Sequence, residues 1–314
     1  MTGVEMAEPA DPLETPEGGE VETEGSALRI LGRTFMENKL AVIGALVLIA
    51  IALFSFVGPL LYHSNQTSPT LILPNGQPGP NAPPGPGHPL GLDNEGYDIL
   101  GRLMIGGQIS LEIGLAVGAI ATIIGVIYGA ISGFFGKYLD MAMMRIVDVI
   151  YAFPVIFLFI FISGVYKPNE TLLIVLLAII TWVVPARLVR GETLSLKTRE
   201  YLQAMRTMGG GAPRAIWRHI VPNTIGTIVV TVTFQIADAI LILSTLQYFG
   251  LGLPPSDPTW GGMLDLAINN ASAQTNGYWW QIFPAGGMIV LTVVAVNFIG
   301  DALRDAFEVR LQKR

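Results

Sequence analysis

Residues 40–62 read LAVIGALVLIAIALFSFVGPLLY, an uninterrupted run without a charged side chain. A helix needs about 20 mostly apolar residues to cross the hydrocarbon core of a bilayer. Five further stretches meet that requirement: residues 113–135, 149–166, 171–186 continuing to 189, 220–237 continuing toward 249, and 281–300. Only helices satisfy their own backbone hydrogen bonds in lipid at such lengths. The sequence therefore predicts an all-α integral membrane protein with six transmembrane helices, within a domain covering residues 40–314.

The composition also indicates lipid as the solvent. Only 13% of the 314 residues are charged and 51% are hydrophobic, whereas a soluble domain carries about 25% charged residues. Eight of the 24 acidic residues lie in the first 24 positions, where no Lys or Arg occurs. Residues 1–26 are therefore predicted to form a disordered acidic tail. The chain has no cysteine, which excludes disulfides, thiolate metal sites and cysteine nucleophiles.

The basic residues are distributed unequally between the two sides of the predicted spans. With a cytoplasmic amino terminus, sixteen Lys and Arg residues lie inside, and only Arg102 and Lys167 lie outside. The positive-inside rule then predicts that both termini and the loop over residues 190–219 are cytoplasmic. The loops over residues 63–107 and 250–280 are predicted to be external, and the first is expected to be extended because it is rich in proline.

Two further patterns describe helices. In residues 27–39, Leu28, Leu31 and Phe35 share one helical face, which predicts an amphipathic helix at the membrane interface. The second predicted span carries two sets of glycines at four-residue intervals, at positions 114, 118, 125, 129 and 133. Small residues at this spacing let helix backbones approach closely. This helix is therefore predicted to be central in the bundle.

Residues 197–223 read KTREYLQAMRTMGGGAPRAIWRHIVPN, a basic segment between two apolar spans. Residues 198–208 predict a helix that ends at Gly209, since glycine accepts the left-handed conformation at a helix carboxyl end. Pro213 is suited to open a second short helix. Two interpretations of the first helix remain: it rests on lipid headgroups, or a soluble protein docks on it. Docking is favoured by the limited apolar face and by the small residue Ala204 near Gly209.

These residues carry a resemblance to a known family. The segment resembles the cytoplasmic loop of the peptide-type permease subunits of ABC importers, whose pattern is Glu-Ala-Ala, three residues, Gly, and later Leu-Pro. Here the pattern reads Gln203-Ala204-Met205, then Gly209, then Val221-Pro222. Further matches extend over most of the chain beyond the acidic tail: residues 38–41, 88–100, 140–154, 249–261 and 300–305. Departures from the family pattern include Gln203 in place of Glu, Tyr97 in place of Arg, and Leu243 in place of a common Glu.

The resemblance implies a C-type permease of an oligopeptide, dipeptide or nickel importer in the plasma membrane of a prokaryote. It implies four kinds of partner: a homologous permease subunit, two ATPase subunits or one two-domain ATPase, an extracytoplasmic solute-binding protein, and membrane lipid. ATP and Mg would bind in the partner subunits, and no cofactor in this chain. The segment over residues 197–222 would dock on the ATPase through Arg199, Glu200, Tyr201, Gln203, Ala204, Met208 and Gly209.

Other sites are not indicated by the sequence. The chain lacks the Gly-x-x-x-x-Gly-Lys-Ser/Thr loop that cradles nucleotide phosphates. Its three histidines are too scattered for a metal cluster, and no pattern indicates an enzyme or nucleic-acid binding. Polar residues within spans are candidates for a translocation path: Glu112, Gln235 and Asp238. Asp238 lies 18 residues past Ile220, which is about 27 Å along a helix at 1.5 Å per residue. An interfacial position near the outer leaflet is therefore an equally good interpretation.

Two other functions remain open. An ion-coupled secondary carrier is disfavoured because the sequence has no evident inverted repeat and no clear pair of buried carboxylates. A non-transporting membrane scaffold would use the same cytoplasmic segment to recruit a soluble partner.

Overall fold

The computed structural model describes residues 32–63, 79–270 and 275–312. Over these ranges the chain forms helices and no β-strand, with two isolated bridges joining Gly85 to His88 and Leu92 to Asp98. This confirms the predicted all-α class. The predicted acidic tail and residues 27–31 of the predicted interfacial helix lie outside the described residues, whereas residues 32–37 are helical.

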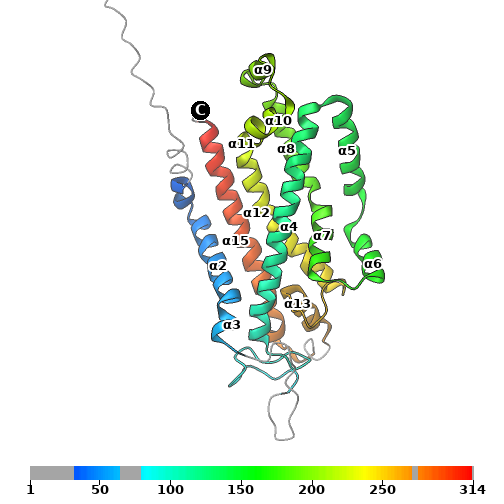
Figure 1. Ribbon diagram of the computed structural model, residues 1–314. Coiled ribbons are helices and arrows are strands. Elements are labelled where there is room, and N and C mark those ends of the chain that lie inside the picture. Colours follow the sequence, from blue (N-terminus) through cyan, green and yellow to red (C-terminus); the bar gives the residue numbers. More distant parts are fainter. Residues whose placement is uncertain (1–31, 64–78, 271–274, 313–314) are drawn as a thin grey trace, which may run out of the picture.

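The helices pack side by side into a bundle (Figure 1). Their order along the chain is α2 (Lys39–Phe56), α3 (Gly58–Leu61), α4 (Ile99–Phe135), α5 (Lys137–Ala152), α6 (Val155–Val165), α7 (Glu170–Thr181), α8 (Val183–Leu196), α9 (Glu200–Thr207), α10 (Ala212–Ala215), η1 (Ile216–Ile220), α11 (Val221–Asn223), α12 (Ile225–Tyr248), α13 (Trp260–Asn269) and α15 (Trp279–Gln312). The carboxyl end of α15 and helix α9 lie at one end of the bundle, and α13 lies at the other (Figure 1).

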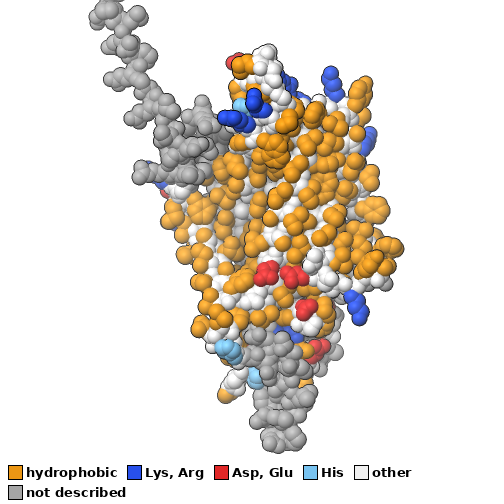
Figure 2. Space-filling model, viewed as in Figure 1, with side chains coloured by type: hydrophobic (Ala, Val, Ile, Leu, Met, Phe, Trp, Pro, Cys, Tyr) orange, Lys and Arg blue, Asp and Glu red, His pale blue; other side chains and the backbone are white. Residues whose placement is uncertain are grey.

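Five helical stretches of the described chain are long and apolar enough to cross a membrane: α2, α4, α7 together with α8, α12, and α15 as far as Phe307. The pair α5 and α6 makes a sixth when it is counted as one span. Hydrophobic side chains cover the flank of the bundle, and Lys and Arg side chains gather near the end that carries α9 (Figure 2). Five or six crossings agree with the six predicted spans.

The second span begins earlier than predicted. Helix α4 begins at Ile99 and not at residue 113, so the predicted external loop 63–107 ends at residue 98. Asp98 caps the helix, because its side chain accepts a hydrogen bond from the backbone N–H of Gly101. The side chain of Arg102, which was counted among the external basic residues, is buried within this extension of the helix. It donates to the Pro255 carbonyl and lies over the Tyr97 ring, and the carboxylate of Asp93 lies 3.9 Å from it.

The third predicted span, residues 149–166, is broken in the structure. Helix α5 ends at Ala152 and α6 begins at Val155, with a bend of 77° between Lys137–Ala152 and Ile156–Ile162. A residue that precedes proline is disfavoured in the helical conformation, and Phe153 before Pro154 is extended, with φ −80° and ψ 124°. Hydropathy alone missed this break because proline does not interrupt an uncharged run.

The glycines of α4 confirm its predicted central position. A Cβ atom at Gly114 or Gly118 would lie within 2.8 Å of side chains on α12. At Gly125, Gly129 and Gly133 it would lie within 2.9 Å of backbone atoms of α8. The two glycine sets therefore serve two different neighbours, and α4 packs most extensively against α8.

The segment predicted as the external loop 250–280 contains a helix at the end of the bundle opposite α9 (Figure 1). Helix α13 lies within this segment, and Trp260 at its start is fully buried against α4. The Trp260 indole donates to the Leu103 carbonyl at 3.0 Å. Nearby, Asn81 accepts hydrogen bonds from Gln281 and Asn270, which ties the Pro-rich segment to α15.

Burial, with the negative charge of Asp98, raises the pKa of Tyr62 to about 12, so this phenol remains a neutral donor to the Gly87 carbonyl.

Candidate functional site

Helix α9 projects from the end of the bundle (Figure 1). It covers Glu200–Thr207, within the residues 198–208 predicted to be helical. Leu202 is fully buried and Met205 is 8% exposed; both pack with Ala215, Ile216 and other apolar residues at the ends of α4 and α8. The helix is therefore seated on the bundle by one face and is not loosely tethered.

The predicted stop at Gly209 has a defined geometry. Gly209 has φ +82°, its N–H donates to the Arg206 carbonyl, and the N–H of Gly210 donates to the Met205 carbonyl. These two bonds form a Schellman motif, which satisfies the last carbonyls of the helix. A Cβ at Gly210 would lie 1.9 Å from the Met205 sulfur. A Cβ at Gly209 would have no atom within 4 Å. Gly209 is thus required by backbone conformation and Gly210 by packing.

The residues predicted to dock on an ATPase share one property. All are exposed at the surface of the chain: Arg199, Glu200, Tyr201, Gln203, Ala204, Met208 and Gly209. Met208 is 81% exposed and Tyr201 is 44% exposed, whereas Met205 on the same helix is buried. The Gln203 side chain donates to the Thr198 carbonyl at 3.0 Å, so it also braces the chain that enters the helix.

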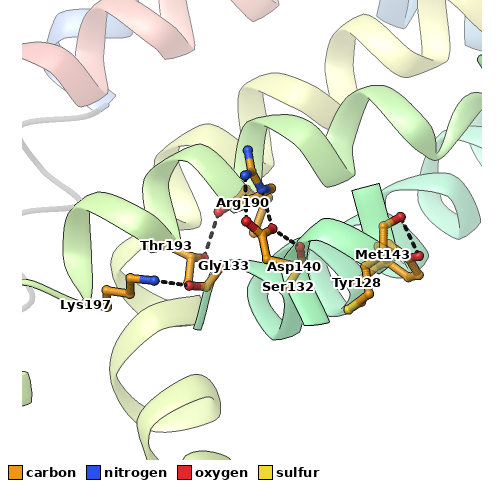
Figure 3. Close-up of polar contacts among 9 residues, drawn as sticks. Tyr128, Ser132, Gly133, Asp140, Met143, Arg190, Thr193 and Lys197 are labelled. Atoms are coloured by element: carbon orange, nitrogen blue, oxygen red, sulfur yellow. Dashed lines mark hydrogen bonds and ion pairs between the residues drawn. The ribbon is translucent and has the colours of Figure 1, made fainter. Parts of the chain in front are cut away.

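A polar cluster lies at the base of α9, where α4, α5 and α8 meet (Figure 3). Arg190 of α8 donates two hydrogen bonds to Asp140 of α5, at 2.5 and 2.7 Å, and Ser132 of α4 donates to the same carboxylate. Lys197, at the end of α8, donates to the Gly133 carbonyl at 2.8 Å. Bidentate Arg–carboxylate pairs hold both distance and orientation. We call these five residues the α4–α5–α8 cluster.

A groove of about 700 Å³ lies alongside α12, bounded by α8 and by the end of α15. The polar residues that α11 and α12 contribute are spaced three or four residues apart and follow one helical face: Asn223, Thr227, Thr231, Gln235 and Asp238. Glu192 of α8 lines the same groove and accepts a hydrogen bond from Thr227. A membrane helix therefore presents a polar track about 22 Å long to this groove, at 1.5 Å per residue over residues 223–238.

The structure brings together two of the three predicted path residues. Gln235 and Asp238 both line the groove. Asp238 lies near the middle of α12, which continues for ten residues to Tyr248. Glu112 does not line the groove and does not open a span; it lies on an exposed face of α4, where it and Asp257 repel the carboxylate of Glu170.

Sequence reasoning missed two features of the site. Glu192 had no distinguishing mark among the charged residues that follow the fourth span. The Asp140–Arg190 pair was also missed, because Asp140 entered only as part of a family motif and Arg190 only as a basic residue. No periodicity links these two residues, because the chain reverses at Gly136, whose φ is +64°, and the partners lie on separate helices.

Comparisons with known proteins agree with this architecture. Residues 113–313 match the family described as "binding-protein-dependent transport system inner membrane component", and residues 26–84 match the N-terminal TM domain of oligopeptide transport permease C. The chain is 36% identical over 279 residues to the oligopeptide transport system permease protein OppC of Bacillus subtilis, covering 89% of this chain and 88% of that protein.

The OppC protein of Escherichia coli K12 is 36% identical over 293 residues, covering 92% of this chain and 93% of that protein. A putative peptide permease of Brucella ovis is 34% identical over 278 residues, covering 88% of this chain and 89% of that protein. The chain belongs to the binding-protein-dependent transport system inner membrane components, and it is a non-catalytic, multi-pass permease subunit of a bacterial ABC importer.

Proposed function

We propose that this chain is the C-type permease of a peptide importer, that the groove along α12 is its half of the translocation path, and that α9 is the coupling helix on which an ATPase subunit docks. The cargo class is supported by the relatives, which are named peptide or oligopeptide permeases. The complex would contain a homologous permease, two ATPase subunits or one two-domain ATPase that bind ATP and Mg, and an extracytoplasmic binding protein.

The observation that carries the coupling role is the division of α9 into two faces. Leu202 and Met205 anchor the helix in the apolar core, while Tyr201, Gln203 and Met208 face outward. An exposed aromatic and a flexible thioether side chain on a rigid helix suit a protein groove. Such a face also transmits force, because the helix cannot tilt without moving the residues beneath it.

The α4–α5–α8 cluster supplies the next step. Lys197 and Arg190 belong to the helix that leads into α9, and their partners Gly133 and Asp140 lie at the end of α4 and the start of α5. Displacement of α9 by the ATPase would therefore move α8, α4 and α5 together. We propose that these helices respond as one unit, since the bidentate pair restrains rotation as well as separation.

The groove suits a path better than a lipid-facing surface. Ionisable residues within membrane spans face a bundle interior or an aqueous cavity, because lipid does not compensate their charge. Glu192 and Asp238 open onto the groove along with the polar track. A homologous permease placed across it would complete the walls. We place α9 and both termini on the cytoplasmic side of the membrane. This orientation agrees with the gathering of basic side chains near α9 (Figure 2).

Transport by the reconstituted complex tests this function. The purified permeases, ATPase and binding protein are placed in vesicles, and uptake of a labelled peptide is measured with and without ATP on the ATPase side. We expect uptake only with ATP and with all subunits. Uptake that follows an ion gradient in the absence of ATP would establish a secondary carrier, and no peptide uptake under any condition would leave the scaffold function.

A further inference from the structure

We infer that Asp238 selects cargo by charge: its carboxylate, open to the groove midway along α12, favours peptides that carry a cationic group. This inference rests on the proposed path and adds a specificity-determining residue to it. The peptide amino terminus and basic side chains are the cationic groups concerned.

The first argument concerns the partners of the charged residues in the groove. The charged side chains that line it in the described chain are Glu192, Asp238 and Arg304. Glu192 accepts a hydrogen bond from Thr227. Among the described residues, no donor forms a hydrogen bond or ion pair with Asp238. Its side chain is also exposed at the groove. The Asp238 carboxylate is therefore open to a passing ligand at both oxygens, whereas one oxygen of Glu192 is already engaged by Thr227.

The second argument concerns position. Helices α12 and α15 run antiparallel, since Gly300 packs against Thr233 and Phe307 packs against Gly226. Arg304 therefore lies near the same level of the groove as Thr227 and Glu192, so charges of opposite sign face the groove at the end nearer α9. Asp238 lies 11 residues beyond Thr227, about 16 Å along the helix axis at 1.5 Å per residue. At that level the groove carries a negative charge alone.

The third argument is energetic. A charge at the wall of a narrow cleft acts through a medium of lower dielectric than bulk water, so it concentrates ligands of opposite sign and repels those of the same sign. Polar groups follow Asp238 along the track, at Gln235 and Thr231. Gln235 is fixed by its own hydrogen bond to the Thr181 carbonyl, so the track beyond Asp238 is polar and preformed. A cationic group leaving Asp238 therefore meets neutral acceptors before it reaches the second carboxylate.

The experiment measures uptake by the complete complex in vesicles, using alanine tripeptides with lysine, leucine or glutamate at the centre. Binding-protein loading is measured for each peptide and kept at saturation, so that differences arise in the permease. The ratio of lysine to glutamate peptide uptake is compared between wild type, Asp238→Asn, Asp238→Lys and the control Glu170→Gln, a carboxylate within a span but outside the groove.

We expect the wild-type complex to favour the lysine peptide by about tenfold, the lower range of electrostatic focusing by charged clefts. Asp238→Asn should reduce the ratio toward unity while the leucine peptide is still transported. Asp238→Lys should invert the preference, and Glu170→Gln should retain the wild-type ratio. A ratio unchanged in both Asp238 variants would overturn charge selection.

A blocking variant separates this inference from the path itself. Val230 lines the groove and is partly exposed, so Val230→Trp should stop uptake of all three peptides if cargo passes there. If that variant does not copurify with the partner permease, Val230→Phe replaces it. Blocked uptake with an unchanged ratio in the Asp238 variants refutes only the charge selection. Normal uptake through an assembled blocking variant refutes the path, and absence of peptide uptake by the wild type refutes the cargo class; either result removes the inference as well.

Discussion

At the residue scale, Gly209 shows how a single backbone conformation shapes the surface that we propose for ATPase docking. Its φ of +82° ends α9 and directs the following residues back toward the bundle. No atom stands within 4 Å of where a Cβ would be, so the requirement for glycine is conformational and not steric. This distinguishes it from Gly210, where Met205 fills the space.

Substitution of Gly209 tests this conformational requirement. Gly209→Val should destabilise the turn by about 1–2 kcal/mol or more, because a β-branched residue resists the left-handed region. Gly209→Asn should retain most function, since asparagine enters that region more readily than other residues. The measurements are membrane abundance, copurification of the ATPase, and uptake. Normal abundance with parallel loss of copurification and uptake is expected for valine alone.

Gln203→Ala provides a milder comparison on the same helix. The Gln203 side chain donates one exposed hydrogen bond to the Thr198 carbonyl. Such a bond contributes about 0.5–1.5 kcal/mol, so we expect most ATPase copurification and uptake to remain. A defect as large as that of Gly209→Val would show that Gln203 contributes far more to ATPase docking than this one hydrogen bond to Thr198.

At the element scale, the close packing of α4 on α8 depends on glycines at positions where a larger side chain would not fit. A Cβ at Gly129 would lie 2.4 Å from the Ala186 carbonyl oxygen and 2.9 Å from the Arg190 nitrogen, both of them backbone atoms. Gly129→Ala should therefore force the two helices apart and destabilise the protein by about 1–3 kcal/mol.

The matched control is Gly191→Ala on the exposed side of α8, where a Cβ would meet nothing within 4 Å. Alanine is favoured over glycine in a helix by about 1 kcal/mol, so this variant should be neutral or more stable. Thermal unfolding in detergent gives the comparison. Equal Tm values for the two variants would mean that helix propensity, and not the close approach, governs this interface.

The ion pair between α5 and α8 also belongs to the element scale. Asp140→Asn or Arg190→Gln should each cost about 1.5–3 kcal/mol, the range for hydrogen bonds to charged groups. The double variant should lose little more than either single one, since the interaction is then already absent. The informative measurement is the number of ATP molecules consumed per peptide imported. Loss of the Asp140–Arg190 pair should raise this ratio while ATPase copurification persists.

At the scale of the whole molecule, the arrangement of the two ends predicts topology. Helix α9 and the carboxyl end of α15 share one end of the bundle, and the segments that lead into α4 and α7 lie toward the other (Figure 1). Glu95 precedes α4 and Asn169 precedes α7. The chain has no cysteine, so single cysteines report without interference. Cysteine at Glu95 or Asn169 should react with an impermeant reagent added to intact cells, and cysteine at Thr198 should react only after lysis. The reverse pattern would invert the orientation.

The sequence by itself determined the helical class, most span positions and the short helix α9 with its stop at Gly209. These depend on local properties: hydropathy over about 20 residues, glycine spacing, and the signals that end a helix. The same local rules failed where a local signal had a distant partner. Helix α4 begins at Ile99, before the span predicted from residue 113, and Arg102 is buried in this extension by the Pro255 carbonyl and the Tyr97 ring.

Only the tertiary structure decided which polar residues act together. Asp140 and Arg190 meet because α4 reverses at Gly136 and α8 returns along its glycine face. Asp238 and Glu192 share a groove because α8 and α12 lie on either side of it, while Glu112, equally plausible by hydropathy, lies on another face. Hydropathy shows where along the sequence a span lies. It does not show which face of that helix a neighbouring helix covers, because that face is set by packing between segments far apart in the chain.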